Sequence, residues 1–235
     1  MSPMIVCFHH AGGSASVFRA WGPNRELDLH PVQLPGREDR RAEPAHTRID
    51  TLVAQLDAEL DPLLDEQHVF FGHSMGALIA HALLRRRQQS GRRLPDALVV
   101  AAAAAPHLHM LDLPLETMSD LEVAETLSSF GGIPPALLAR PEWLSALLAP
   151  VKADLWVCRS VRQVAPAPIP VPLHALGGTA DTLVTPDRVA AWEEHAGAGF
   201  TLTMIDAGHF VVTENGAQVQ DLLRRVVAEL TVLTG

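Results

Sequence analysis

Six short apolar runs alternate with longer amphipathic segments along this chain of 235 residues, and this alternation restricts the fold more than any other feature. Strands that are buried on both faces of a sheet have continuous apolar sequences, whereas helices repeat apolar residues every three or four positions. The alternation of the two predicts a mostly parallel sheet with helices on both faces, which is the α/β class. The predicted strands span residues 4–8, 30–34, 68–71, 98–101, 171–176 and 200–205, and the predicted helices span residues 47–64, 75–89, 187–195 and 218–230.

Residues 107–157 interrupt this alternation, because they contain helix-like pieces and no convincing strand other than 154–157. Ser119 and Glu122 have the spacing of a capping box, which predicts a helix that continues to Phe130. The glycine pair 131–132 then predicts a stop or a hinge before a second helix. From these residues alone, the segment is either an insertion that packs over the sheet or a small second domain.

The charge balance and the cysteines limit the partners and the compartment that we expect. The 18 basic and 27 acidic residues give a net charge of −9, which is unfavourable for phosphate binding, so nucleic acid is not an expected partner. The sequence has no apolar run of about 18 residues, so we expect no membrane span. The first strand is predicted to start at residue 4, so we expect no secretory signal. Cys7 and Cys158 lie in apolar runs, which favours buried thiols in a reducing cytoplasm.

Residues 72–76, Gly-His-Ser-Met-Gly, directly follow a predicted strand and directly precede a predicted helix. This is the context of the nucleophile elbow, G-x-S-x-G. So tight a turn forces the central residue into strained backbone angles and needs small residues two positions before and after it. The turn would place the Ser74 hydroxyl above the carboxyl edge of the sheet and near a helix N-terminus, where a developing oxyanion is favoured.

A nucleophilic serine needs a base, and the base needs an acid that orients it. In the elbow topology the chain order is serine, acid, histidine. Asp181 follows the fifth predicted strand and His209 follows the last one, so the order Ser74, Asp181, His209 fits. Asp206 is the alternative acid, but it lies only three residues before His209. His73 and His81 are disfavoured as bases because they lie on the nucleophile's own strand and helix.

An oxyanion hole in this topology takes one backbone N–H from the residue after the nucleophile and another from the loop after the first strand. That loop, residues 9–15, reads His-His-Ala-Gly-Gly-Ser-Ala, and its glycines allow the backbone to approach a substrate. We assign the N–H groups of Met75 and Ala11 as the two donors, with His10 one residue away from the second.

Four motifs stand in the chain in this order: Gly12-Gly13-Ser14-Ala15, Leu34-Pro35-Gly36-Arg37-Glu38 with Arg40, Gly72-His73-Ser74-Met75-Gly76, and Gly208-His209-Phe210. Together they closely resemble the type II thioesterases of polyketide and nonribosomal peptide assembly lines, and the resemblance runs across nearly the whole chain. It implies a single α/β-hydrolase domain over residues 1–235, with residues 107–157 as a helical lid. It also implies Ser74, Asp181 and His209 as the catalytic triad and the Met75 and Ala11 amides as oxyanion donors.

The activity implied by this resemblance is hydrolysis of acyl chains held as thioesters on the phosphopantetheine arm of carrier proteins. Acyl or peptidyl carrier domains would be the partners, and no metal or organic cofactor would be needed, since the substrate brings the phosphopantetheine. The residues leave two alternatives open: an esterase or acyltransferase that uses the same triad, and a catalytically weak module that docks on carrier domains. We expect a monomeric, cytoplasmic enzyme without membrane affinity.

The predicted lid is rich in apolar residues for a segment outside the sheet, so part of it could line a channel for the acyl chain. We take Met118, Leu127, Phe130 and Trp143 as candidate substrate-binding residues, the alternative being that they only pack the lid onto the core. The sequence departs from the family in His9-His10, where proline and an aromatic residue or histidine are usual, and in its lack of tyrosine. Both departures concern acyl preference and the lid.

Two further patterns have modest predicted roles. The basic run 85–87, with 92–93, falls at the C-terminal end of the nucleophile helix, where cations complement the helix dipole and solubilise the surface. Carrier proteins are typically acidic, so docking is the alternative, but this end points away from the predicted site. His107, His109 and Asp112 fit no strong zinc pattern, and we predict no metal site.

Overall fold

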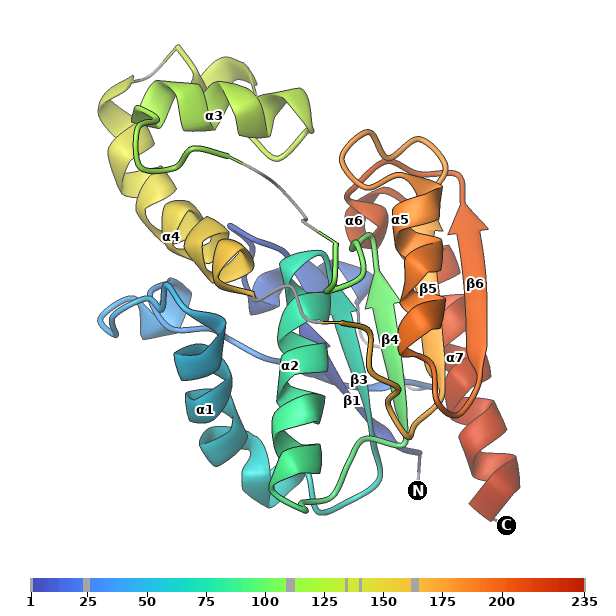
Figure 1. The fold of residues 1–235 in the computed structure, drawn as a ribbon. Coiled ribbons are helices and arrows are strands. Elements are labelled where there is room, and N and C mark those ends of the chain that lie inside the picture. Colours follow the sequence, from blue (N-terminus) through green and yellow to red (C-terminus); the bar gives the residue numbers. More distant parts are fainter. Residues whose placement is uncertain are drawn as a thin grey trace.

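The computed structural model of the chain describes residues 2–22, 26–108, 113–133, 135–139, 141–161 and 165–234. Its centre is a six-stranded sheet in the order β2-β1-β3-β4-β5-β6, and every neighbouring pair of strands is parallel. The strands are β1 (Met4–Phe8), β2 (Asp28–Pro31), β3 (His68–His73), β4 (Ala97–Ala101), β5 (Leu173–Gly178) and β6 (Phe200–Ile205). The predicted parallel α/β architecture is confirmed (Figure 1).

Helices cover both faces of the sheet, because successive strand residues point to opposite sides. On β1, Val6 and Phe8 pack into a core cluster with α1 and α2, whereas Ile5 and Cys7 pack into a second cluster with α7. Figure 1 shows α1 and α2 in front of the strands and α7 behind them. The helices are α1 (Ile49–Leu60), α2 (Met75–Gln89), α3 (Asp120–Ser129), α4 (Pro141–Ser160), α5 (Pro186–Ala190), α6 (Val211–Glu214) and α7 (Gly216–Thr234).

The segment between β4 and β5 carries α3 and α4, which lie above the carboxyl edge of the sheet (Figure 1). Its apolar side chains form a separate cluster, in which Val123 of α3 and Leu144 and Leu148 of α4 are buried. The capping box at Ser119 and Glu122 is present and begins α3 as predicted. The short strand predicted at 154–157 is wrong, because these residues belong to α4.

Helix α4 packs against both the lid and the sheet domain, and it contains Pro150, which cannot donate a backbone hydrogen bond. Residues on both sides of Pro150, among them Leu148, Val151 and Leu155, pack within the lid cluster. Near the C-terminal end of the helix, Val157 joins the main core and the Ser160 hydroxyl accepts a hydrogen bond from the Ile49 N–H at 2.7 Å. The C-terminal end of α4 is therefore docked on the sheet domain, while the rest of the helix packs within the lid.

The chain order places a topological switch between β1 and β3. From β1 the chain moves outward to β2, and it then returns to β3 on the other side of β1. In parallel sheets the loops on either side of such a point diverge, and ligands bind in the crevice outside the carboxyl ends of the strands. The loops after Phe8 and after His73 leave the sheet at this point.

Candidate active site

The turn that carries Ser74 has the strained geometry that its sequence predicts. Ser74 connects β3 to α2 with φ 55° and ψ −117°, a conformation that few side-chain-bearing residues adopt. A Cβ atom on Gly72 would lie 2.2 Å from the Gly76 carbonyl oxygen, and one on Gly76 would lie 2.1 Å from the Phe8 carbonyl oxygen. Both glycines are therefore required by close backbone contact, as the sequence analysis predicted.

Ser74, His209 and Asp181 form one hydrogen-bonded chain. The Ser74 hydroxyl donates to His209 Nε2 at 2.9 Å, and His209 Nδ1 donates to Asp181 Oδ2 at 2.9 Å. The loops that carry the acid and the histidine are themselves joined, because the Ala180 N–H donates to the Ala207 carbonyl at 3.0 Å. This is the geometry in which an imidazole can take a proton from a hydroxyl while a carboxylate fixes its tautomer.

The Asp181 carboxylate is held in its charged form by its surroundings. Burial alone would raise its pKa, but the hydrogen bond from His209 and those from the Val184 and Leu183 N–H groups outweigh burial, so the pKa lies below its usual value. The two backbone N–H groups donate to Oδ1 at 2.9 and 2.8 Å, and this leaves Oδ2 for the imidazole. Asp206, the alternative acid, is exposed.

The alternative bases have other partners. His73 Nε2 donates to the backbone carbonyl of His209 at 2.8 Å, so this ring supports the loop of the histidine rather than contacting Ser74. Burial, and next the nearby His209, lower the pKa of His73 to about 3. His81 is buried against Trp192 and His195 on the side of α2 away from the triad. Both rings are neutral at pH 7.

One of the expected oxyanion donors, Met75, directly follows Ser74 in the chain, and the other, Ala11, lines the cavity beside it. Met75 is the first residue of α2, where backbone N–H groups have no partner within the helix. Ala11 belongs to a turn in which the Gly13 N–H donates to the His10 carbonyl at 3.0 Å, and Ala11 lines the cavity above Ser74. The turn needs glycine at position 12, whose φ is +76°.

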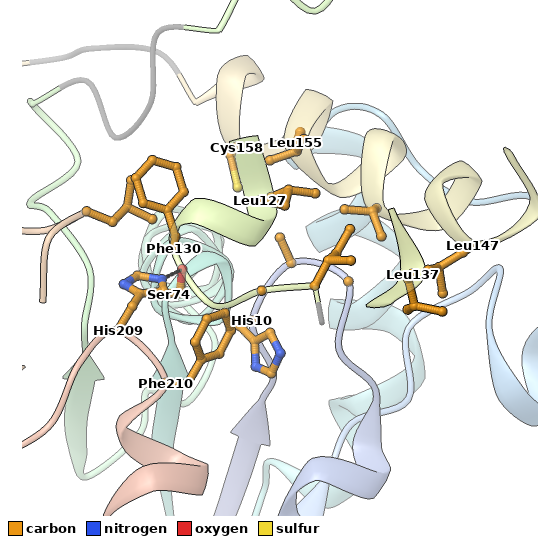
Figure 2. A pocket seen from close by; sticks show the side chains of 16 residues that line it. His10, Ser74, Leu127, Phe130, Leu137, Leu147, Leu155, Cys158, His209 and Phe210 are labelled. Carbon is orange, nitrogen blue, oxygen red and sulfur yellow. Dashed lines mark hydrogen bonds between the residues drawn. The ribbon is translucent and has the colours of Figure 1, made fainter. Parts of the chain in front are cut away.

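A largely apolar cavity of about 170 Å³ opens at Ser74 and His209 and runs beneath the lid. Figure 2 shows the hydroxyl and the imidazole at one end of it and Leu137 and Leu147 at the other. The lid contributes Leu127 and Phe130 to the lining, as expected, and α4 adds Leu155 and the partly buried Cys158. A hydrocarbon chain bound to the serine would meet predominantly apolar side chains here.

Two of the expected channel residues do not reach this cavity. Met118 packs against the lid's own apolar cluster, so its side chain stabilises the lid. Trp143 is 58% exposed and lies outside the cavity lining. The expectation for both was wrong because an apolar residue in a two-helix lid can face the cavity, the lid interior or solvent, and the sequence spacing does not choose among them.

Comparison with known proteins decides the family. The "Thioesterase domain" family matches residues 3–230. The chain belongs to the thioesterase family.

Among its relatives, the gramicidin S biosynthesis protein GrsT of Aneurinibacillus migulanus is 33% identical over 90% of this chain and 83% of its own length. The solved type II thioesterase BorB of the borrelidin cluster superposes with a TM-score of 0.80 and 33% identity, over 97% of this chain and 92% of its own. RedJ, the thioesterase of the prodiginine pathway in Streptomyces coelicolor, superposes with a TM-score of 0.83 and 30% identity, over 97% and 89%. The protein is thus a serine hydrolase of α/β-hydrolase fold, among the type II thioesterases of nonribosomal peptide and polyketide pathways.

The sequence did not predict a pair of charged residues that lies beside the active site. Arg37 and Asp154 form a buried, two-bonded ion pair at 2.6 and 2.7 Å, and the carboxylate also accepts from the Gly12 N–H at 2.8 Å. The only signal was Arg37 itself, in the motif that follows Leu34. Asp154 gave none, because residues 154–157 were interpreted as a short strand and a single aspartate usually faces solvent.

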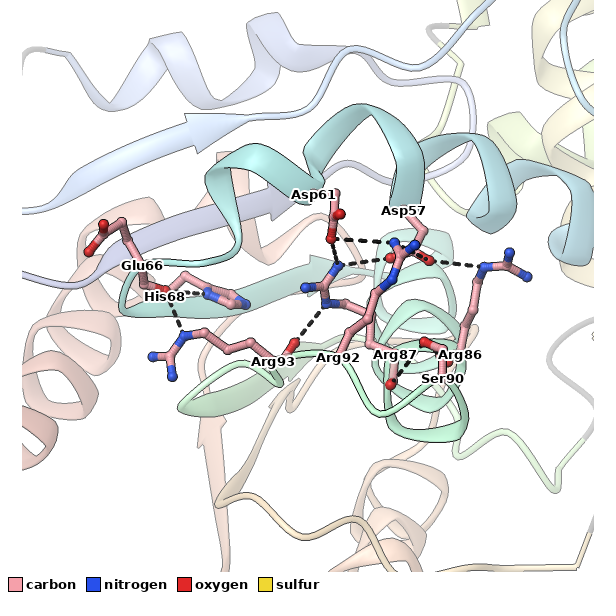
Figure 3. A network of polar contacts seen from close by, with 9 residues as sticks. All are labelled: Asp57, Asp61, Glu66, His68, Arg86, Arg87, Ser90, Arg92 and Arg93. Carbon is pink, nitrogen blue, oxygen red and sulfur yellow. Dashed lines mark hydrogen bonds and ion pairs between the residues drawn. The ribbon is translucent and has the colours of Figure 1, made fainter.

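The basic run at the far end of α2 is not simply a solvated surface. Arg87 is buried, donates to Asp57 at 2.9 Å and Asp61 at 2.8 Å, and also donates to the Arg93 carbonyl at 2.7 Å (Figure 3). For Arg87 the expected solubilising role is therefore wrong, because α1 supplies the buried carboxylate of Asp57 as its partner. Arg86 and Arg92, which are more exposed, contact the same Asp57 at 3.1 and 3.3 Å.

The remaining predictions made from the sequence concern a metal site and a membrane span. His109 and Asp112 of the weak metal pattern lie outside the described residues, and His107 contacts His195 Nε2 through Nδ1 at 2.9 Å. Within the described ranges, no three His, Cys, Asp or Glu side chains gather as metal ligands. No helix in the part of the chain that the structure describes is long and apolar enough to span a bilayer.

Proposed function

We propose that this thioesterase hydrolyses acyl thioesters carried on the phosphopantetheine arm of acyl or peptidyl carrier protein domains, as an editing and housekeeping enzyme of an assembly line. The observation that carries the proposal is the hydrogen-bonded chain Ser74–His209–Asp181 at the mouth of an apolar, lid-covered cavity. The biosynthetic names of its relatives support the substrate class. Catalytic roles for Ser74, His209 and Asp181 are part of this proposal.

In the first step, Ser74 Oγ attacks the thioester carbonyl carbon while His209 Nε2 takes the hydroxyl proton. The carbonyl electron pair moves onto oxygen, and the N–H groups of Met75 and Ala11 stabilise the resulting oxyanion. The C–S bond then breaks, the arm leaves as a thiol with the proton returned by His209, and the acyl group remains on Ser74. The charged Asp181 stabilises the imidazolium that exists between these events.

In the second step, His209 takes a proton from a water molecule, which attacks the acyl carbonyl and re-forms the oxyanion. The C–O bond to Ser74 breaks, and the proton on His209 returns to Oγ. The product is a free carboxylic acid and the serine is regenerated. These steps use side chains, backbone N–H groups and water, so we propose that the enzyme needs no metal or organic cofactor of its own. We propose further that it acts as a monomer in the cytoplasm.

The deciding experiment incubates the protein with a panel of acyl-loaded carrier proteins and follows the pantetheine arm by mass spectrometry. We expect loss of the acyl mass with wild type and retention with Ser74→Ala, and we expect a fluorophosphonate probe to label Ser74. Labelling together with transfer to an alcohol or amine in preference to water would replace hydrolysis by acyl transfer. Absence of both labelling and turnover would leave the docking module as the better account.

A further inference from the structure

The turn that presents Ala11 toward the cavity is held from outside by two charged side chains. The His10 carbonyl, which belongs to the same peptide group as the Ala11 N–H, accepts hydrogen bonds from the Gly13 N–H at 3.0 Å and from His9 Nδ1 at 2.8 Å. The central peptide group, which joins Ala11 to Gly12, has no hydrogen-bond partner among residues 10–13 and could adopt either of the two common turn orientations. The orientation of this central peptide, and with it the backbone that immediately follows the Ala11 N–H, therefore depends on contacts that the turn makes with other elements.

The first external contact comes from the second half of helix α4. Asp154 Oδ2 accepts a hydrogen bond from the Gly12 N–H at 2.8 Å, across 142 residues of sequence. One turn earlier in α4, Val151 packs against the same residue, because a Cβ atom on Gly12 would lie 3.1 Å from Val151 Cγ2. The lid helix thus rests directly on the peptide that follows Ala11.

Arg37 supplies the second contact and completes the arrangement. Its Nη1 and Nη2 atoms donate to Asp154 Oδ2 and Oδ1 at 2.6 and 2.7 Å, and Nη1 also donates to the Gly13 carbonyl at 3.2 Å. The side chains are only 8% and 3% exposed. A planar guanidinium that binds a carboxylate through two bonds fixes direction as well as distance. The Gly12 N–H and the Gly13 carbonyl are consequently held from both sides.

We propose that Arg37 and Asp154 are a positioning pair that orients the Ala11 N–H as an oxyanion donor, and that they make this orientation depend on α4 being seated. The inference rests on the proposed function. Neither side chain lines the cavity, so the pair acts through the turn and does not touch the reacting atoms. Displacement of α4 would remove the carboxylate from Gly12, and the charge of Arg37 would lose its partner at the same time. The lid and the oxyanion hole are thereby linked through one ion pair.

The test compares Asp154→Asn and Arg37→Lys with Asp57→Asn, a matched control that breaks the other buried arginine–aspartate pair far from the site. Asparagine keeps an oxygen for the Gly12 N–H but loses the charge, and lysine keeps the charge but loses the two-bonded geometry. We measure kcat and KM on an acyl carrier protein, together with affinity for two chain-matched ligands, an alkyl trifluoromethyl ketone and the corresponding unreactive amide. Ser74 Oγ adds reversibly to the ketone, its proton passes to His209, and the ketone oxygen becomes an oxyanion.

We expect both site variants to lose about 10- to 100-fold in kcat and in ketone affinity, somewhat less than the loss of a whole oxyanion donor. KM and amide affinity should change less than about threefold, because the apolar cavity is intact. Asp57→Asn should lower the melting temperature and leave kcat and ketone affinity unchanged. Retention of full ketone affinity in both site variants, or an equal loss of ketone and amide affinity, would overturn the inference.

A second variant and a labelling measurement cover the cases in which one variant does not fold or the natural substrate is not turned over. If Asp154→Asn does not fold, Arg37→Lys, the milder change, still reports on the pair. The rate at which a fluorophosphonate labels Ser74 is measured in every variant, since it needs no natural substrate. A wild-type protein that is labelled rapidly but releases no acyl group would contradict the proposed function, while slower labelling of the site variants alone would still support the positioning role.

Discussion

Two buried arginine–aspartate pairs lie at opposite ends of this protein, and they have nearly the same chemistry. Arg37 and Asp154 are 8% and 3% exposed, and Arg87 and Asp57 are 1% and 4% exposed. The Arg87 pair joins α1 to α2 beside Asp61, at the end of α2 away from Ser74 (Figure 3). The Arg37 pair joins the lid helix α4 to the turn that contains Ala11.

The difference between the pairs lies in the elements that they connect. The residues of the Arg87 pair are 30 positions apart in sequence, on two helices that pack side by side on the sheet. Those of the Arg37 pair are 117 positions apart and connect the lid to a catalytic loop. Removing either partner of a buried pair leaves an uncompensated charge and destabilises the fold. Burial thus marks both pairs as structural, and only the Arg37 pair also has a place in the chemistry.

The largest effect is expected at the catalytic end, from Asp181→Asn. The asparagine amide would favour the wrong tautomer of His209, and we expect kcat to fall about 10⁴-fold, or about 5.5 kcal/mol, with the melting temperature little changed. Asp206→Asn is the matched control, since it alters the exposed carboxylate three residues before His209 and should keep kcat. Equal losses in the two variants would remove Asp181 from the proposed triad.

The opposite end should respond in stability and not in rate. We expect Arg87→Met to lower the free energy of unfolding by about 3 kcal/mol, the lower part of the range for a broken buried pair, because Asp57 keeps Arg86 and Arg92 as neighbours. Urea titration measures the loss, and kcat on an acyl carrier protein should equal that of wild type below the melting transition. A change in kcat of tenfold would show that the two ends are coupled.

Acid should destabilise the protein, because one histidine of β3 and one of α2 are buried in the neutral form. Burial, and next neighbouring histidines, lower the pKa of His73 and His81 to about 3. In the unfolded chain a histidine pKa is about 6.5, so below this pH the unfolded state binds more protons, and stability falls as the pH falls toward 3. Each such histidine lowers the free energy of unfolding by up to about 1.4 kcal/mol for every pH unit below the unfolded-state pKa.

Urea titrations at pH 7 and pH 5 test this dependence. For His81→Gln, the loss of stability between the two pH values should be smaller than for wild type by about 2 kcal/mol. The activity of this variant at pH 7 should be unchanged, since His81 lies away from the triad against Trp192. Identical pH dependence in the variant and in wild type would contradict neutral burial of His81.

The smallest effect concerns the lid, where a cavity residue and a surface residue can be compared. Leu127→Trp should fill part of the cavity and lower kcat/KM for long acyl chains about tenfold relative to acetyl. Trp143→Ala should leave this ratio unchanged, because Trp143 is 58% exposed and outside the lining. Kinetics on acetyl- and octanoyl-loaded carrier protein give the ratio. The reverse ranking of the two variants would place the acyl channel elsewhere.

Sequence patterns predicted some elements to the residue and others poorly. The strand at 200–205 and the helix at 75–89 have the predicted bounds, because both end at clear breakers or caps. The second strand was expected at 30–34 and occurs at Asp28–Pro31. Val32 and Leu34 are apolar and buried, as strand residues would be, but they follow the end of the strand. The strand expected at 154–157 lies in α4, because a short apolar run has the same appearance in a strand and in a buried helix.

The sequence by itself determined the parallel sheet, the glycines of the elbow and the order Ser74, Asp181, His209, because each follows from local backbone geometry or from chain order along one sheet edge. Tertiary structure alone decided that Arg37 meets Asp154, that Arg87 is buried, and that Leu127 but not Trp143 faces the cavity. The physical reason is that a charge or an apolar side chain is placed by the partner that folding brings to it. Such partners come from distant segments, and local periodicity carries no information about them.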